Sequence, residues 1–303
     1  MEDLRADQPA VLISGSASGI GWACVEAMTA EGWHVFAGYR QPEDATRLTA
    51  AFGGRVTPVR LDVTHEPDIQ NAVDSIRRNL SRTQPRRVLR ALINNAGLVV
   101  AGPLETLPPG DLALQWAVNV QGAVRLTQCF LPLLKERPDS RVVFMGSISG
   151  LMTLPVTGAY SISKHALEAV ANAFRLELKP WRVHVSLLEP GPIRTPIWSR
   201  AMEEAAERAE RLNPRVLSAY AGLMNRVRAL AADSAGKAPP PSVVASQAVH
   251  ALTAVKPAIR YFSGRGIRLK VALSRLPARL QDALILRRLQ APLRFGVGWP
   301  LIE

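Results

Sequence analysis

Residues 10–21 read AVLISGSASGIG, and this stretch decides the fold. Its apolar opening is typical of a buried strand, and residues 22–30 are typical of a helix. Between them, Gly15, Gly19 and Gly21 let the backbone turn sharply and approach a ligand closely. The first N–H groups of a helix have no partner within it, so they attract an anion. The stretch predicts strand, tight turn and helix around a pyrophosphate, with an ordinary glycine-rich connection as the alternative.

Short runs of β-branched residues follow this stretch and alternate with helical patterns. Counting the first strand, they lie at residues 11–13, 34–38, 55–61, 90–93, 141–146, 183–188 and 259–262. An alternation of strand and helix predicts a parallel sheet with right-handed crossovers and helices on both faces. The predicted fold class is therefore α/β, a doubly wound parallel sheet of Rossmann type, in which ligands gather at the carboxyl ends of the strands.

Helical patterns dominate the chain after the sixth predicted strand. Residues 192–233 are helical in pattern, with a part rich in Glu and Arg at 202–212 and a more amphipathic part at 215–232. The proline-rich run 238–242 is typical of a connector, and it leads into a helix that ends near Leu252.

Tyr160 and Lys164 are the most informative pair of side chains. They are four residues apart in a helical run, so a helix places the phenol and the ammonium on one face. A neighbouring cation favours the anionic form of a phenol, which then exchanges a proton with an alcohol or carbonyl near neutral pH. Taken alone, such a pair is more often a solvated lysine beside a half-buried tyrosine.

Two polar residues in apolar surroundings strengthen this interpretation. Ser147 follows the apolar strand 142–146, where its hydroxyl can hold a substrate oxygen. Asn119 interrupts the apolar helical stretch 116–120, and an asparagine inside a helix usually has a specific partner such as a water or a backbone carbonyl.

Together these motifs resemble the short-chain dehydrogenase/reductase family, in its order and approximate spacing over about the first two hundred residues. Asn119, Ser147, Tyr160 and Lys164 match the catalytic tetrad of that family, and residues 94–97 match its Asn-Asn-Ala-Gly turn. The resemblance implies an NAD(P)-dependent oxidoreductase acting on CH–OH groups, with a Rossmann-type domain at residues 1–255 that includes a substrate lid at about 192–233.

The resemblance also implies which residues hold the dinucleotide. Asp62 matches the acid that binds the adenine, and Pro190-Gly191 with Thr195 matches the segment against the nicotinamide carboxamide. Ser14 is a departure, because the family more often has Thr there, but either hydroxyl can make a similar local hydrogen bond. The implied cofactor-binding residues are Gly15, Ser16, Ser18, Gly19, Ile20, Gly21, Tyr39, Arg40, Asp62, Val63, Asn95, Ala96, Gly97, Tyr160, Lys164, Pro190, Gly191, Ile193 and Thr195.

The roles expected in the tetrad follow from carbonyl reduction, which needs a hydride and a proton. We expect Tyr160 to act as general acid in reduction and as base in oxidation, while Ser147 holds the substrate oxygen and stabilises charge on it. We expect Lys164 to lower the pKa of Tyr160 and to bind the nicotinamide ribose. Asn119 would hold a water that connects Lys164 to solvent.

The end of the second predicted strand favours NADP over NAD. An acidic residue there would bind the ribose hydroxyls and select NAD, whereas this chain has Tyr39 followed by Arg40. A guanidinium can meet a 2′-phosphate with paired hydrogen bonds. The alternative is a surface arginine near a loop, since the glycine loop itself has no basic residue and carries Ser18.

The net charge of +12 is concentrated in the C-terminal segment 256–303, which we expect to be a basic extension. It holds ten Lys or Arg against two acidic residues, and leucines recur in it at helical spacing, with Pro277 expected to split it into two helices. Such a segment can lie on an anionic membrane surface or dock on its own domain or a partner subunit. With no recognition motif and little aromatic interleaving, we expect no nucleic-acid partner.

Composition narrows the remaining classes. No run of eighteen apolar residues and no signal-peptide pattern is present, so we expect a cytoplasmic protein that is at most peripheral to a membrane. Two cysteines in apolar helical contexts suggest reduced core thiols. The five histidines lack metal-ligand spacing, so we expect no metal.

The substrate can be predicted only as a class. The chain is similar to the hydroxysteroid and retinol dehydrogenase branch, which implies a lipophilic alcohol, ketone or aldehyde of steroid, retinoid or terpenoid type. The expected pocket residues are Leu151, Leu154, Val156, Ile197, Trp198 and Met202. The family pairs the helices near residues 111–135 and 161–179 between subunits, so a homodimer or homotetramer is expected. The alternative function is a non-catalytic cofactor-binding regulator or membrane-surface scaffold.

Overall fold

The computed structural model describes residues 7–83, 86–210 and 214–290, and its centre is a sheet of seven parallel strands. Each predicted run forms one of them. The strands are β1 (Gln8–Ile13), β2 (His34–Tyr39), β3 (Val56–Arg60), β4 (Arg87–Asn94), β5 (Arg141–Met145), β6 (His184–Pro190) and β7 (Arg260–Ser263). Their order across the sheet is β3-β2-β1-β4-β5-β6-β7, so the winding reverses between β1 and β4. A doubly wound sheet binds ligands at such a reversal.

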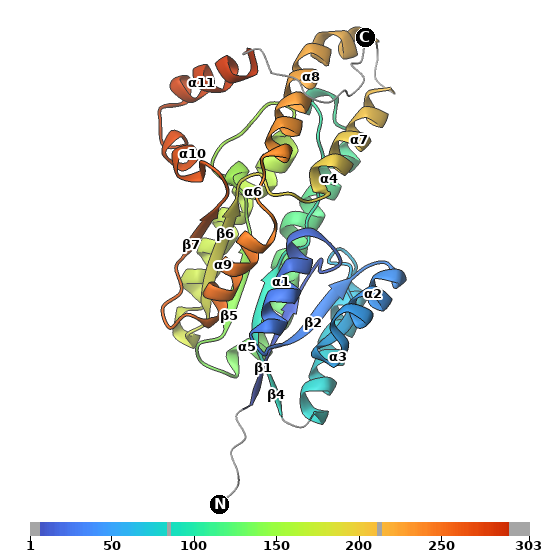
Figure 1. Ribbon diagram of the computed structural model, residues 1–303, viewed down its shortest axis with the longest axis vertical. Helices are drawn as coiled ribbons and strands as arrows, with labels where there is room; N and C mark the ends of the chain where they lie inside the picture. Colours follow the sequence, from blue (N-terminus) through green and yellow to red (C-terminus); the bar gives the residue numbers. More distant parts are fainter. Residues whose placement is uncertain (1–6, 84–85, 211–213, 291–303) are drawn as a thin grey trace, which may run out of the picture.

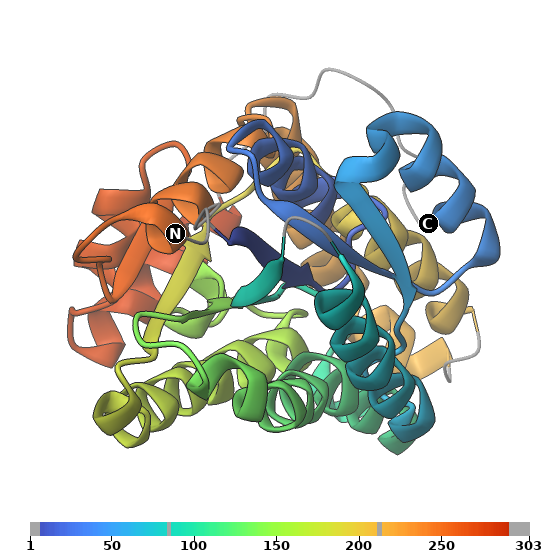
Figure 2. The ribbon, with the colours of Figure 1, turned by 90° about the horizontal axis from the view of Figure 1, so that it is seen from below.

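Helices cover both faces of the sheet, as Figure 2 shows. One face carries α1 (Gly19–Ala30), α2 (Pro42–Phe52) and α9 (Ser242–Thr253). The other carries α3 (Glu66–Arg82), α5 (Gly122–Lys135) and α6 (Gly158–Glu177). α4 (Pro109–Trp116) continues into α5 through the π-helical turn η3 (Ala117–Gln121). Short 3-10 turns lie at η1 (Gly53–Arg55), η2 (Leu104–Thr106), η4 (Ile148–Gly150) and η5 (Lys179–Trp181).

The central strands divide their side chains between two cores. In β1, Val11 and Ile13 pack in the core shared with α1, α2 and α9, whereas Leu12 packs in the core shared with α3, α5 and α6. Successive side chains of a strand point to opposite faces, so a continuous apolar run is what a strand covered on both sides requires. This explains why the first strand could be predicted from its composition alone.

Four further helices gather at the end of the molecule where the strands terminate (Figure 1). They are α7 (Ile197–Ala209), α8 (Pro214–Gly236), α10 (Ile267–Leu273) and α11 (Ala278–Gln290). The predicted helical patterns are confirmed, and Pro277 separates α10 from α11 as expected. Leu289 of α11 is buried with Val156, Met224 and Val227, so the last helix is packed on α8.

Two features bear on the predicted division of the chain. The expected boundary at residue 255 falls before β7, which pairs with β6 inside the sheet. The first residues of the predicted extension therefore include a strand of the sheet. Among the described residues, no helix is long and apolar enough to cross a membrane.

Candidate active site

Ser14 ties together the turns that follow β1 and β4. Its hydroxyl oxygen accepts hydrogen bonds from the backbone N–H groups of Asn95 and Ala96, both at 3.0 Å. The Asn95 side chain donates in return to the carbonyl oxygens of Ser14, at 3.0 Å, and Gly15, at 2.9 Å. The local hydrogen bonding expected of a hydroxyl at this position is present, and it joins two predicted cofactor-binding segments.

The glycine loop has no room for side chains. A Cβ added at Gly21 would stand 2.1 Å from the carbonyl oxygen of Gly15, and one added at Gly15 would stand 2.9 Å from Cα of Ala96. Gly15 and Gly19 also have φ angles of 64° and 56°, which side chains disfavour. Ser18 is the N-cap residue of α1 and makes no side-chain capping bond. A backbone cradle at a helix N-terminus fits a pyrophosphate.

The segment after β6 folds back onto this loop. A Cβ added at Gly19 would stand 3.2 Å from Cγ2 of Thr195, so the two predicted cofactor segments touch. Gly191 donates its N–H to the carbonyl oxygen of Ser263 at 2.7 Å, which fixes the turn against the end of β7. Ile193 is buried in the core beneath. The structure therefore brings the expected pyrophosphate and nicotinamide segments together.

Arg40, directly after β2, is a predicted cation, and Arg47 on α2 is a second one that the sequence did not reveal. Arg40 follows Tyr39 and is exposed. Arg47 of α2 donates to the carbonyl oxygen of Ala17 in the glycine loop at 3.0 Å, and its guanidinium lies 5.4 Å from the ring centroid of Trp22. No motif marks Arg47, because only the packing of α2 against the loop brings it there. Two arginines thus flank the loop.

The end of β3 lies beside the end of β2, because the two strands are neighbours in the sheet. Oδ1 of Asp62 accepts hydrogen bonds from the backbone N–H and the hydroxyl of Thr64, at 2.9 Å and 2.6 Å. Val63 is buried against Gly122, where an added Cβ would stand 2.6 Å from Cγ2 of Val63. This pair therefore occupies a well-fixed position at the edge of the predicted adenine site.

Asn119 lies in the π-helical turn between α4 and α5, and such turns are frequent at functional sites. Its side chain accepts from the N–H of Leu98 at 2.9 Å and donates to the carbonyl oxygen of Leu98 and to Oγ of Ser163, both at 3.0 Å. Ser163 in turn donates to the carbonyl oxygen of Tyr160 at 2.7 Å. Gln115, one turn earlier, also donates to Leu98, at 2.8 Å. Gln115 was not predicted from the sequence. A second amide four residues before Asn119 could have indicated it, because residues four apart share a helix face.

Ser147, Tyr160 and Lys164 converge between the end of β5 and the first turns of α6. All three are buried, and the hydroxyl of Ser147 lies close enough to the phenol of Tyr160 to lower its pKa. The ammonium of Lys164 donates to the carbonyl oxygen of Met145 at 2.6 Å and lies 5.6 Å from the ring centroid of Tyr160. The structure therefore places a phenol, a hydroxyl and an ammonium side by side, with Asn119 one hydrogen-bonded residue away.

The pKa of Tyr160 shifts in the direction opposite to the expected one. Burial raises the pKa of Tyr160 to about 12, and the nearby hydroxyl of Ser147 offsets only part of that effect. Burial also lowers the pKa of Lys164 to about 8, since the low-polarity surroundings disfavour the ammonium. The desolvation of both groups outweighs their proximity, so in this structure the phenol is protonated at neutral pH.

Apolar side chains of α7 cover the phenol. The ring of Trp198 meets the ring of Tyr160 edge-on at 5.6 Å, and Met202 and Ile197 belong to the same cluster. Val156, another expected pocket residue, lies instead in the cluster beneath α8 and α11. The surroundings of the phenol are therefore apolar, and they come from the segment predicted to be the lid.

A cluster of three charged side chains holds α6 against β6 and β7. The guanidinium of Arg260 on β7 contacts the carboxylates of Glu168 on α6, at 2.5 Å, and Glu189 on β6, at 2.7 Å. Burial and the neighbouring charge of Glu168 raise the pKa of Glu189 to about 7. Because two carboxyl groups share one cation, the cluster favours retention of a proton. It ties the helix of Tyr160 to the strand that leads into Pro190.

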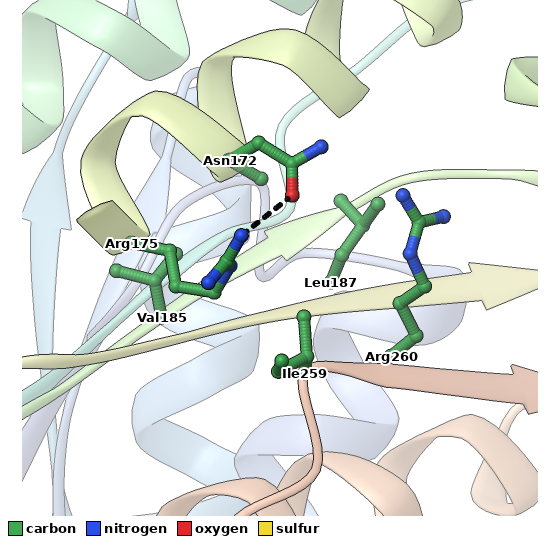
Figure 3. Close-up of a pocket in the computed structure, with 7 residues that line it drawn as sticks. Asn172, Arg175, Val185, Leu187, Ile259 and Arg260 are labelled. Carbon is green, nitrogen blue, oxygen red and sulfur yellow. Dashed lines mark hydrogen bonds between the residues drawn. The ribbon is translucent and has the colours of Figure 1, made fainter.

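Figure 3 shows a small cavity beside this cluster, between α6 and the strands. Its volume is about 10 Å³, and its labelled lining residues are Asn172, Arg175, Val185, Leu187, Ile259 and Arg260. A space of this size holds about one water molecule. The cavity is therefore too small for a dinucleotide or a lipophilic substrate, and it is separate from the candidate active site. Among the described residues, no group of His, Cys, Asp or Glu side chains could hold a metal ion.

Comparison with known proteins identifies the kind of site. The family model described as short chain dehydrogenase matches residues 9–206. The chain is 32% identical over 284 residues to an NADPH-dependent 3-dehydrocapnine reductase of Ornithobacterium rhinotracheale, covering 92% of this chain and 96% of the relative. It is 32% identical over 262 residues to human 17-beta-hydroxysteroid dehydrogenase type 1, covering 84% and 76% of the two chains. It is 31% identical over 296 residues to mouse retinol dehydrogenase 5, covering 94% and 90%.

A solved structure agrees with this assignment. A short-chain dehydrogenase from Streptomyces avermitilis is 26% identical and has a TM-score of 0.74, with 94% of this chain and 99% of that chain covered. The predicted family is thereby confirmed, and the glycine cradle described above fits the nicotinamide dinucleotide that such enzymes use. The chain belongs to the short-chain dehydrogenase family and is an oxidoreductase.

Proposed function

We propose that this protein uses NADP(H) to reduce a lipophilic ketone or aldehyde to an alcohol. The observation that carries the proposal is the environment of Tyr160. Its phenol is buried, has the hydroxyl of Ser147 beside it and lies beneath the apolar side chains of α7. A protonated phenol in an apolar site, next to a hydroxyl that can hold a carbonyl oxygen, suits proton donation to a reduced carbonyl.

Each member of the tetrad has a distinct part in this reaction. Ser147 holds the carbonyl oxygen, and Tyr160 gives its proton to the alkoxide that forms there; in alcohol oxidation Tyr160 accepts that proton instead. Lys164 binds the nicotinamide ribose. Asn119 keeps the proton route to Lys164 in place through its bridge from Leu98 to Ser163, with one lone pair of Oδ1 left for a water. When bound, the cofactor supplies the hydride.

The preference for NADP rests on two arginines. Arg40 at the end of β2 can pair with the 2′-phosphate, and Arg47 adds a second positive charge beside the glycine loop. Asp44 forms an ion pair with Arg47 at 3.0 Å, which orients the guanidinium but also takes part of its charge. Arg40 therefore makes the larger contribution. The relative named as an NADPH-dependent reductase, whose match covers 92% of this chain, supports the preference for NADP.

The substrate class follows from the covering side chains and from the relatives. Trp198, Met202 and Ile197 offer apolar surface next to the phenol. Relatives named for a hydroxysteroid and for retinol support a steroid-, retinoid- or terpenoid-like substrate. A polar sugar or acid would leave its hydroxyl or carboxyl groups without partners against these side chains.

We further propose a homodimer or homotetramer in the cytoplasm, at most peripheral to membranes. The helices expected to pair between subunits, α4–α5 and α6, expose apolar side chains. Trp116 is 40% exposed and Ile162 is 44% exposed. A two-fold contact across these helices would remove both from water.

The test is a cofactor-oxidation screen of the full-length protein with NADPH and with NADH across carbonyl classes. We expect NADPH consumption with bulky lipophilic ketones or aldehydes and little with sugars. Tight NADPH binding without turnover of any carbonyl would support the alternative, a non-catalytic regulator or scaffold. Equal or tighter binding of NADH would contradict the assignment of Arg40.

A further inference from the structure

The two C-terminal helices turn leucines toward solvent. Leu269 of α10 is 65% exposed, and Leu280 and Leu284 of α11 are 53% and 42% exposed. α11 already has an inward face, because Ile285 and Leu289 pack against α8. Residues four apart share a helix face, and Leu280 and Leu284 lie roughly opposite Ile285 and Leu289 around the helix. Leu280 and Leu284 therefore face away from the side of α11 that packs on α8.

Cations surround these leucines. Between Gly264 and Gln290 the chain has one acidic residue, Asp282, and seven basic ones: Arg265, Arg268, Lys270, Arg275, Arg279, Arg287 and Arg288. None of the seven forms a salt bridge with another described residue, whereas Arg260 just before them holds two carboxylates. Burial and the charge of Arg288 lower the pKa of Lys270, which shows that like charges crowd together here. Within residues 264–290, seven cations therefore face a single acidic residue, Asp282.

We propose that α10 and α11 form a docking face for an anionic lipid surface, with Leu269, Leu280 and Leu284 entering the headgroup region and the arginines meeting lipid phosphates. Short amphipathic helices that combine apolar side chains with many cations lie in the plane of such an interface. Neither helix needs to cross the bilayer.

Other occupants of the docking face fit it less well. A second copy related by two-fold symmetry would bring the arginines of one face against those of the other, with a single acid on each side. Single-stranded nucleic acid would favour aromatic side chains for stacking, and residues 264–290 contain none. A bilayer rich in anionic lipid supplies both the apolar layer and the negative charge.

The docking face is adjacent to the candidate active site. Ile267, the first residue of α10, lies against the nicotinamide segment, since a Cβ added at Gly191 would stand 3.3 Å from its Cδ1. In Figure 1, α10 and α11 lie at the same end of the molecule as α7 and α8. If the proposed function holds, docking would bring the site to the phase in which a lipophilic substrate is concentrated. Docking itself does not depend on turnover.

The experiment is co-sedimentation of the full-length protein with vesicles of phosphatidylcholine alone and with vesicles containing phosphatidylglycerol. We expect binding that requires the anionic lipid and weakens with salt. A truncation at Lys256 would also remove β7, so point variants are the better probe. NADPH binding, measured on every variant, reports that the protein is folded.

Two matched pairs of variants separate the charge from the leucines. Arg287→Gln with Arg288→Gln removes two adjacent cations from the last turn of α11, and we expect about thirtyfold weaker partitioning. Arg77→Gln with Arg78→Gln removes two adjacent cations from α3, and we expect less than a twofold change. Leu280→Gln with Leu284→Gln should weaken partitioning about tenfold.

The matched apolar control is Val255→Gln with Ile259→Gln, in the loop before β7. Val255 is 89% exposed and Ile259 is 52% exposed, and we expect vesicle binding unchanged.

Equal binding by the wild type and both tail variants would overturn the proposal. Loss on charge removal alone would reduce the contact to non-specific adsorption and overturn it too. So would a dimer that dissociates in the leucine variant without vesicles. A protein that binds vesicles but reduces no carbonyl would refute only the proposed function.

Discussion

The glycine loop with its partners and the covering helices are held together in different ways. Around the loop, Ser14 and Asn95 exchange hydrogen bonds with backbone groups, and added Cβ atoms would collide with backbone at Gly15 and Gly21. The covering helices α7, α8 and α11 rest on apolar clusters, and Gly222 in α8 has nothing within 4 Å of an added Cβ. In the first region, Gly15 and Gly21 have no room for a side chain, whereas the buried positions of the second region require only apolar character.

This difference explains how one fold serves many substrates. Backbone groups hold the part of the ligand that does not vary, so the residues there are tightly constrained. Side chains hold the part that does vary, and they can be exchanged at a cost of packing alone. Tyr160 lies under the second region, covered by Trp198 of α7, with the hydroxyl of Ser147 beside its phenol.

The largest expected effect comes from removing the phenol hydroxyl of Tyr160. Tyr160→Phe keeps the ring under Trp198 and removes the proton, so we expect the reduction rate to fall by about 10³-fold with NADPH affinity retained. Tyr220→Phe is the matched control, because it removes a phenol hydroxyl of α8 that donates to Glu105, at 2.5 Å, and to no member of the tetrad. The control should keep its rate within about twofold. Comparable turnover in Tyr160→Phe, measured by stopped-flow, would remove Tyr160 from the chemistry.

A glycine-to-alanine substitution should be harmful in the glycine loop and favourable in α8. In Gly21→Ala the new methyl group meets the carbonyl oxygen of Gly15, so we expect NADPH affinity to fall about a hundredfold. In Gly222→Ala the helix gains propensity in open space, so we expect the free energy of unfolding to rise by about 0.5–1 kcal/mol. Cofactor titration and denaturant unfolding of both variants measure these effects. Unchanged cofactor affinity in Gly21→Ala would show that the glycine loop accommodates a side chain as readily as α8 does.

The cluster behind α6 should give the protein a pH-dependent stability. The folded-state pKa of Glu189 lies at about 7, above its ordinary value of 4.5, so its contribution is complete below pH 4.5 and is lost as the pH rises through about 7. In Glu189→Gln this loss, on the order of 3 kcal/mol, should disappear. Urea unfolding from pH 4.5 to 8.5 measures it, with Glu177→Gln at the exposed end of α6 as control. Parallel pH profiles for wild type and Glu189→Gln would contradict the assignment.

The smallest effect is expected at the edge of the loop. Arg40→Leu should weaken NADPH binding about tenfold and leave NADH binding unchanged, because only NADPH carries the 2′-phosphate. Arg47→Leu should act in the same direction by less, since Asp44 already shares its charge. Arg55→Leu, on the turn after α2, serves as control. Equal losses for both cofactors in Arg40→Leu would mean that the arginine only shapes the loop.

The fold could be predicted from the sequence because a strand that is buried on both faces is a continuous apolar run. All seven strands coincide with β-branched runs, and the functional positions follow strand ends, where Ser147 and Asn95 fall. Pro277 lies in the gap between α10 and α11, directly before the first residue of α11, where its missing N–H costs no helical hydrogen bond.

What the sequence did not reveal depends on packing between distant segments. Arg47 reaches the glycine loop only because α2 folds over it, and Trp198 meets Tyr160 only because α7 crosses α6. The raised pKa of Tyr160 is a consequence of that same burial, and no spacing between Tyr160 and Lys164 could have shown it. The pairing of Arg260 with Glu168 and Glu189 joins residues on three elements and was likewise invisible.

The π-helical turn Ala117–Gln121 contains one residue more than regular α winding would need. Deleting Val118 would straighten the helix and turn its two halves by about 100° relative to each other. The deletion would leave the sheet, the glycine loop and Tyr160 in the sequence, yet Gln115 and Asn119 could no longer both reach Leu98. One inserted residue thus makes the difference between a regular helix and a helix whose Gln115 and Asn119 side chains both reach Leu98.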